Sequence, residues 1–121
     1  MVNWFEIPVS NMERAIKFYN HVFQLDLKSM GLGDQEMAWF PFDNNLPGIS
    51  GSLVKHEKFY TPSPLGIVIY FSVEDIESTL SKVDDMKTEI IQSKKQISPD
   101  HGYMALFMDS EGNRIALHSK N

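Results

Sequence analysis

The sequence predicts an α+β fold that consists of two similar halves, each with the order strand, helix and three strands. The first observation is a repeat, because segments 9–16 and 73–80 have matching character at an offset of 64 residues. The second is that most connections between predicted strands are too short for parallel crossovers. A four-stranded sheet with one helix also keeps an open concave face, which a second such unit can share. We therefore expect two βαβββ modules whose curved, mixed sheets form a cleft.

The first half begins with a strand over residues 3–9, in which side chains alternate between two faces. Ser10 to Glu13 match a capping box, in which the Ser10 hydroxyl and the Glu13 carboxylate each bond a free amide at the start of a helix. Apolar residues then recur at helical spacing as far as Phe23. This pattern predicts an amphipathic helix directly after the first strand.

Short extended segments follow this helix. The alternation of side chains predicts strands over residues 25–30, 35–42 and 49–56. A Gly-Leu-Gly-Asp turn at 31–34 separates the first two, and residues 43–48 (DNNLPG) have the composition of a loop. These elements complete a first module over residues 1–60.

The second half follows a break at Pro62 and Pro64 and forms a second module over residues 61–121, within a single domain of 121 residues. Residues 65–73 (LGIVIYFSV) are the most apolar predicted strand, and Glu74-Asp75 start a second helix. We then expect a short strand over residues 88–92 and a loop over residues 93–102.

A hairpin over residues 103–118 closes the chain. Its turn, DSEGN at 109–113, contains Gly112, which takes a positive φ at no steric cost, and Asp and Asn side chains that can bond their own backbone. On the return strand, Arg114, Ala116 and His118 share one face. Polar side chains on this face become candidates for a site.

Composition restricts the partners of the chain. The formal charge of −5 argues against nucleic acid and weakly favours a cationic small molecule. No segment approaches the roughly 18 uninterrupted apolar residues of a membrane span, and the first residues do not resemble a signal peptide. The lack of cysteine excludes disulfides and thiolate sites. We therefore expect a cytoplasmic protein that binds neither nucleic acid nor membrane.

Four segments resemble the vicinal oxygen chelate superfamily, which contains glyoxalase I, extradiol dioxygenases, fosfomycin-resistance enzymes and bleomycin-resistance binding proteins. These segments are 9–19 (VSNMERAIKFY), 51–55 (GSLVK), 70–76 (YFSVEDI) and 109–118 (DSEGNRIALH). The resemblance implies the paired-module fold of glyoxalase and bleomycin-resistance proteins. It also implies a homodimer, because in short members the clefts often lie at a subunit interface. It does not choose an activity, since one scaffold hosts unrelated chemistries.

In metal-dependent members, His, Gln or Glu side chains at four equivalent strand positions hold a divalent ion. The resemblance carries these positions onto Trp4, Ser52, Val68 and Ala116, and the internal repeat independently pairs Trp4 with Val68 and Ser52 with Ala116. Trp, Val and Ala provide no oxygen or nitrogen ligand of the kind that such ions require. We therefore predict no metal at these positions and no cofactor.

The remaining polar and aromatic candidates define a predicted ligand-binding set, without an assigned catalytic residue. Its members are Trp4, Glu6, Trp39, Ser52, Tyr70 and His118. Glu6 would act as an acceptor or base, and Tyr70 and His118 as donors or acid/base groups. In the alternative interpretation, His118 caps a final strand near the surface and Glu6 pairs with Arg114 or another cation.

Three functions follow from this set. The preferred one is metal-independent binding of a small apolar or cationic molecule in the cleft, as in the bleomycin-resistance proteins. The second is a metal-dependent enzyme of the glyoxalase or dioxygenase type, with ligands displaced to Glu6, His56 and His118. The third is a metal-free enzyme that transfers protons through Glu6, Tyr70 and His118. Whether the protein is an enzyme stays open.

Overall fold

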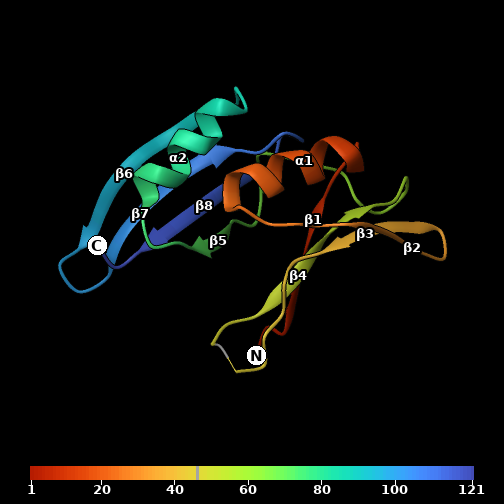
Figure 1. Cartoon of the computed structure of the whole chain (residues 1–121), viewed down its shortest axis with the longest axis horizontal. Coiled ribbons are helices and arrows are strands. Elements are labelled where there is room, and N and C mark those ends of the chain that lie inside the picture. The colour runs from red at the N-terminus through yellow and green to blue at the C-terminus, as the bar shows by residue number, and fades with distance from the viewer. Residues whose placement is uncertain (46) are drawn as a thin grey trace.

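The computed structural model describes residues 1–45 and 47–121, and it contains two four-stranded sheets that each carry a helix on one face (Figure 1). The first module contains β1 (Trp4–Pro8), α1 (Met12–Phe23), β2 (Ser29–Leu32), β3 (Gln35–Trp39) and β4 (Ser50–Lys55). The second contains β5 (Ile69–Ser72), α2 (Ile76–Asp85), β6 (Ile90–Ser98), β7 (Gly102–Met108) and β8 (Arg114–Ser119). The predicted α+β fold of two βαβββ modules is confirmed. Neither of these two helices is long and apolar enough to cross a membrane.

The two sheets share one topology. Their strand orders are β1-β4-β3-β2 and β5-β8-β7-β6, and in each sheet the first two strands are parallel while the others are antiparallel. Glu6 pairs in register with Ser52 on β4, and Tyr70 pairs in register with Ala116 on β8. Both pairs are related by the offset of 64 residues that the sequence repeat predicts.

The start of α1 differs from the predicted capping box. Asn11, not Ser10, is the N-cap, and its side chain accepts a hydrogen bond from the Arg14 amide at 3.0 Å. Ser10 instead donates its amide and hydroxyl to Glu111 in the second module. The Ser10 amide therefore donates to Glu111 of the other module and not to Glu13 of its own helix, and sequence spacing alone does not reveal this distant contact. The N-cap of α2 is Asp75, which lies 64 residues after Asn11, so the internal repeat includes the N-cap position.

Two predicted boundaries in the second module are wrong. β5 begins at Ile69, not at residue 65, because Gly66 adopts a φ of +103° and breaks the extended chain. β6 runs through Ser98, into the segment predicted as a loop, and pairs with β7 through irregular registers such as Gln96 with Tyr103. It lies at the edge of its sheet, where polar, charged residues are tolerated because one side of the strand faces solvent.

Smaller differences affect the first module. β2 contains Gly31 and Leu32, which the sequence assigned to a turn, and the turn itself comprises only Gly33 and Asp34. β3 ends at Trp39, before the predicted end at residue 42. In the predicted loop 43–48, Leu46 lies outside the described residues.

The cores of the two modules merge into one hydrophobic cluster. Phe71 of the second module contacts three phenylalanines of the first, with centroid distances of 4.6 Å to Phe23, 5.4 Å to Phe40 and 5.9 Å to Phe5. Aromatic pairs of this kind stabilise beyond the area that they bury. Gly51 allows the close approach of β1 and β4, since a Cβ there would meet the Phe5 carbonyl oxygen at 2.2 Å. The helix-covered faces of both sheets therefore form the hydrophobic core.

A polar network with buried carboxylates at its centre and exposed residues at its edge also joins the modules, and we call it the module joint. It consists of Ser10, Asn11, Arg14, Tyr19, Asp109, Glu111 and Asn113. The Glu111 carboxylate accepts the amides of Ser10 and Asn11 at 2.9 and 2.8 Å. It also accepts two hydrogen bonds from Arg14, at 2.7 and 2.9 Å. Burial raises the pKa of Glu111, but these donors outweigh burial and lower the pKa to about 2.

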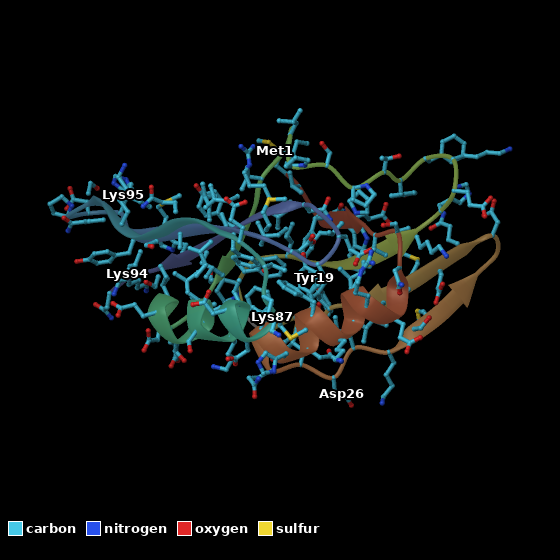
Figure 2. The ribbon with its side chains drawn as sticks, turned by 90° about the horizontal axis from the view of Figure 1, so that it is seen from above. Met1, Tyr19, Asp26, Lys87, Lys94 and Lys95 are labelled. Atoms are coloured by element: carbon cyan, nitrogen blue, oxygen red, sulfur yellow. The ribbon has the colours of Figure 1, made fainter. Side chains whose placement is uncertain are left out.

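The second carboxylate of the joint is bonded in the same way. The Tyr19 hydroxyl donates to Asp109 at 2.6 Å, and Tyr19 lies near the centre of the molecule (Figure 2). Asp109 also accepts the Asn113 side-chain amide and the backbone amides of Glu111 and Asn113. Burial raises the pKa of Asp109, against the lowering effect of these bonds. The Asn113 amide further donates to the Pro8 carbonyl, so the hairpin turn holds both β1 and α1.

Candidate functional site

A pocket of about 510 Å³ lies between β1, the inter-module segment 61–67 and the start of β8. Trp4 and Glu6 from β1 form part of its wall, and Arg114 from β8 forms another part. Leu65 and Ile67 line it from the inter-module segment and are 79% and 90% exposed. Exposed apolar side chains around a hollow of this volume are typical of a small-molecule site.

The two tryptophans of the chain meet beside this pocket. The Trp4 and Trp39 rings pack edge to face with centroids 5.7 Å apart, and the side chains remain 37% and 49% exposed. They extend from the face of the first sheet that α1 does not cover, which we call the outer face of that sheet. An exposed aromatic pair of this kind presents a large, rigid apolar surface to a ligand.

Ser52 lies between these groups on the outer face. It is in register with Glu6 on one side and with Trp39 on the other. Its residue is 0% exposed, and its hydroxyl makes no hydrogen bond to the described part of the chain. A buried hydroxyl without a partner is unfavourable. Ser52 is covered by its neighbours and does not itself line the pocket beside β1.

Glu6 has a partner that the sequence analysis did not identify. Its Oε1 atom accepts a hydrogen bond of 2.5 Å from the Tyr60 hydroxyl, and Tyr60 lies on the inter-module segment. This bond raises the pKa of Tyr60. Among the described residues no ion pair joins Glu6 to Arg114, which was the alternative considered for Glu6.

Tyr70 and His118 lie on the second sheet, away from this pocket. Tyr70 is 54% exposed and lines a separate hollow of about 640 Å³ with Phe5 and Phe40. The His118 ring donates from Nε2 to the carbonyl oxygen of His101 at 2.7 Å, which ties the end of β8 to the turn before β7. The structure therefore groups Trp4, Glu6, Trp39 and Ser52, and it leaves the other two candidates apart within one chain.

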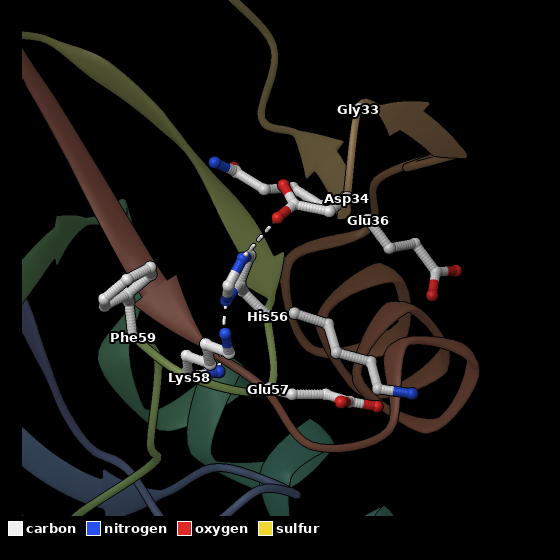
Figure 3. Close-up of a pocket in the computed structure, with 9 residues that line it drawn as sticks. Gly33, Asp34, Glu36, His56, Glu57, Lys58 and Phe59 are labelled. Atoms are coloured by element: carbon white, nitrogen blue, oxygen red, sulfur yellow. Dashed lines mark hydrogen bonds and ion pairs between the residues drawn. The ribbon is translucent and has the colours of Figure 1, made fainter.

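A second pocket, of about 470 Å³, surrounds His56 and Asp34 (Figure 3). The His56 Nδ1 atom accepts the Lys58 amide at 3.1 Å, so Nε2 carries the proton and donates to Asp34 at 3.0 Å. The Phe59 ring stacks on the imidazole at 5.0 Å. The hydrogen bond from His56 lowers the pKa of Asp34. Because both ring nitrogens already have partners, His56 holds this turn in place and has no free nitrogen for a ligand.

The residues present do not fit the metal site of the resembling enzymes. The equivalent positions hold Trp4, Ser52, Val68 and Ala116, of which only Ser52 has a side-chain atom with a lone pair to offer, because the indole N–H of Trp4 only donates. In the described part of the chain, no three His, Cys, Asp or Glu side chains lie close enough to share an ion. The displaced set also does not converge, because Glu6, His56 and His118 bond to Tyr60, Asp34 and His101, respectively. We therefore derive no chemistry through a metal.

Three residues of the site were not identified from the sequence. Leu65 and Ile67 fall in a segment whose apolar pattern predicts a buried strand, and Tyr60 falls in a segment with no periodic pattern. Arg114 was identified only as a partner for Glu6. The prolines at 62 and 64 could have indicated these residues, because they mark an irregular connecting segment, and binding residues often lie on such segments.

The family model for the Glyoxalase/Bleomycin resistance protein/Dioxygenase superfamily matches residues 1–117. Comparison with the curated proteins finds no match.

Several solved structures are similar over the whole chain. A glyoxylase/bleomycin resistance protein/dioxygenase domain from Frankia sp. EAN1pec has a TM-score of 0.73 and 17% identity, covering 100% of this chain and 98% of that chain. An antibiotic binding protein from Streptomyces sp. CB03234 has a TM-score of 0.69 and 22% identity, covering 100% and 96%. A glyoxalase I mutant from Zea mays has a TM-score of 0.69 and 15% identity, covering 98% of this chain and 45% of the enzyme. At these identities the likeness is one of fold.

Proposed function

The chain belongs to the Glyoxalase/Bleomycin resistance protein/Dioxygenase superfamily, and on that basis we propose that it binds a small apolar or cationic molecule without a metal ion. The observation that carries this proposal is the pocket beside β1, where an exposed tryptophan pair adjoins a carboxylate. A solved structure with the same fold is described as an antibiotic binding protein, which agrees with this class of function.

The apolar part of the ligand would contact the outer face of the first sheet and the inter-module segment. Trp4 contributes its ring, and Leu65, Ile67 and Ile69 contribute branched side chains to the pocket wall. A pocket of about 510 Å³ falls within the range that accommodates drug-sized molecules. Burying these side chains against a ligand removes apolar surface from water, which drives binding.

The preference for a cation rests on Glu6 and on the tryptophans. The Tyr60 bond uses one carboxylate oxygen of Glu6 and orients the group. A protonated amine near the other oxygen would also lie close to Trp4, whose ring face attracts cations. The net charge of −5 adds a general attraction for cations.

We further propose that the protein acts as a homodimer. Both helices lie on the same side of the two sheets, and the packing contacts between the modules include the α1–α2 pair (Figure 1). The outer faces of the two sheets therefore point away from the helices, and neither closes over the other within one chain. A second copy could place the face with Tyr70 and His118 opposite the face with Trp4 and Glu6. Light scattering coupled to size exclusion tests this, and a monomer at working concentration contradicts it.

The binding proposal can be tested with two ligands of the same shape. Cyclohexylbutylamine is cationic, cyclohexylbutanol is neutral, and neither absorbs where tryptophan does, so emission from Trp4 and Trp39 reports binding directly. We expect both to bind and the amine to bind more tightly. Glu6→Gln should remove most of this difference, about tenfold in Kd, which equals about 1.4 kcal/mol. Glu74→Gln, the same charge change at an exposed site outside the pocket, should leave it unchanged.

Metal independence requires a separate measurement. We expect no stoichiometric metal in the purified protein and no rise in melting temperature with Ni²⁺, Zn²⁺ or Mn²⁺. One bound equivalent of metal that is lost in Glu6→Ala or His118→Ala would instead support a metal-dependent enzyme with displaced ligands. In the ligand experiment described before, failure of both cyclohexylbutylamine and cyclohexylbutanol to bind would contradict the binding proposal itself.

A further inference from the structure

Arg114 is the unusual residue of the pocket beside β1, because its guanidinium group has unused hydrogen-bonding capacity. One terminal nitrogen donates to the Gly66 carbonyl at 3.1 Å. The Nε atom is buried and has no partner in the described part of the chain. No carboxylate among the described residues forms an ion pair with this side chain. A guanidinium carries five N–H donors, so most of its bonding capacity here is not used by the Gly66 bond.

The other arginine of the chain shows what a satisfied guanidinium looks like in this fold. Arg14 forms two hydrogen bonds with Glu111, including one from its Nε atom at 2.7 Å. The chain contains 16 acidic residues against 11 basic ones, so carboxylates are abundant. A partly buried cation without an anion is unfavourable, and its Nε–H group adds a further unsatisfied donor. Arg114 therefore has the properties of a group whose partner comes from outside the chain.

The surroundings of Arg114 define the rest of that partner. Arg114 lines the same pocket as Leu65, Ile67 and Ile69, so an anion bound there would continue into an apolar environment. Glu6 lines the pocket as well but repels an anion from the β1 side. The two charged residues would therefore orient a ligand, with an acidic group at Arg114 and a neutral or basic group near Glu6.

We propose that this pocket binds an apolar molecule that carries a carboxylate, and that Arg114 recognises the carboxylate. The assignment rests on the proposed small-molecule function and adds to it an acidic group at Arg114, at the opposite end of the ligand from the neutral or basic group near Glu6. A carboxylate matches the planar fork of a guanidinium and can accept from its two terminal nitrogens together. It would supply the missing counter-charge through these nitrogens, since the Nε atom itself is buried.

The test compares cyclohexylbutanoate with cyclohexylbutanamide, which have nearly the same shape and differ in charge. Calorimetry and tryptophan emission should show the carboxylate binding about tenfold more tightly than the amide. Arg114→Gln should abolish this difference while leaving the amide affinity unchanged. Arg114→Lys, which keeps the charge but not the fork, should retain only part of it. Lys120→Gln makes the same charge change at an exposed residue and should have no effect.

The outcomes separate this assignment from the broader proposal. Binding of cyclohexylbutylamine with no preference for the carboxylate over the amide overturns the role of Arg114 and leaves the binding function standing. A carboxylate preference that persists in Arg114→Gln also overturns it. If none of the four cyclohexyl compounds binds, the small-molecule function and this assignment fail together. Melting temperatures of both Arg114 variants within a few degrees of the parent establish that loss of binding is not loss of folding.

Discussion

The module joint and the pocket beside β1 use the same kinds of side chain in opposite ways. In the joint, the Glu111 carboxylate accepts from two backbone amides and an arginine, so its charge is fully bonded within the chain. In the pocket, and among residues 1–45 and 47–121, the Glu6 carboxylate has one partner and the buried Nε of Arg114 has none. A polar group whose bonds are complete stabilises the fold, whereas one whose bonds are incomplete is a place for a ligand. This difference is the basis on which we propose Glu6 and Arg114 as ligand-binding groups and assign Glu111 to the fold.

Among the polar residues of the joint and the pocket, Glu111 should have the largest effect on stability when it is removed. Glu111→Ala leaves two amides at the start of α1 and the Arg14 guanidinium without their acceptor. We expect the free energy of unfolding to fall by about 2 kcal/mol, because charge-assisted hydrogen bonds to a buried carboxylate are lost while the half-exposed Arg14 is hydrated again. Urea unfolding measures this loss. Glu13→Ala, in the exposed first turn of the same helix, should cost less than about 0.5 kcal/mol.

The same carboxylate should make stability depend on acid. Glu111 has a pKa of about 2 in the folded chain, against a usual value of 4.5. A carboxyl group with a lower pKa when folded contributes stability above its unfolded pKa, and this contribution is lost as the pH falls through the folded pKa. The urea midpoint should therefore drop as the pH falls from about 4.5 toward about 2.

Glu111→Gln is the control for this titration, because glutamine has a similar shape and no titration. Its urea midpoint should fall less over the same range than that of the parent. Asp109, whose pKa is raised by burial, acts with the opposite sign and favours folding as it becomes protonated. If the urea midpoint falls equally with pH in the parent and in Glu111→Gln, the loss of stability in acid does not come from Glu111.

On the pocket side, Trp39→Ala should weaken binding with little change in folding. Trp39 is half-exposed and contacts Trp4 rather than the core. We expect an affinity loss of about 1.5 kcal/mol, or roughly tenfold, for cyclohexylbutylamine. Unfolding free energy should change by less than about 1 kcal/mol, as for a surface aromatic pair. Phe40→Ala is the control with the opposite expectation. Because Phe40 is in the hydrophobic core, its loss should lower the free energy of unfolding.

The smallest effects come from two buried serines on β4. Ser50 donates its hydroxyl to the carbonyl groups of Phe40 and Pro41 at 3.1 and 2.9 Å, whereas the Ser52 hydroxyl has no partner among the residues that the structure describes. We expect Ser50→Ala to cost about 1 kcal/mol and Ser52→Ala about zero, because only the first loses a hydrogen bond. Urea unfolding of both variants tests this contrast. A loss in Ser52→Ala as large as that in Ser50→Ala would mean that Ser52 has a partner, such as an ordered water.

Local patterns predicted the parts of the fold that depend on local physics. The alternation in β1 and β8, the apolar stripe of α1 and the Gly112 turn all follow from side-chain periodicity and backbone freedom. The offset of 64 residues predicted which strands are equivalent, and the registers of Glu6 with Ser52 and Tyr70 with Ala116 agree with it. Local rules failed where a distant residue intervened, as when Glu111 displaced the predicted role of Ser10.

Element order and side-chain alternation are properties of neighbouring residues, so they were enough to predict the module architecture. That Trp4, Val68 and Ala116 provide no metal ligand follows from the side chains alone. Which charges are paired depends instead on contacts between distant parts of the chain. Glu111 and Arg14 are 97 residues apart in the chain, and Glu6 and Tyr60 are 54 apart, so no local pattern records either contact. In the same way, only the three-dimensional arrangement of the described residues leaves the buried Nε of Arg114 without a partner.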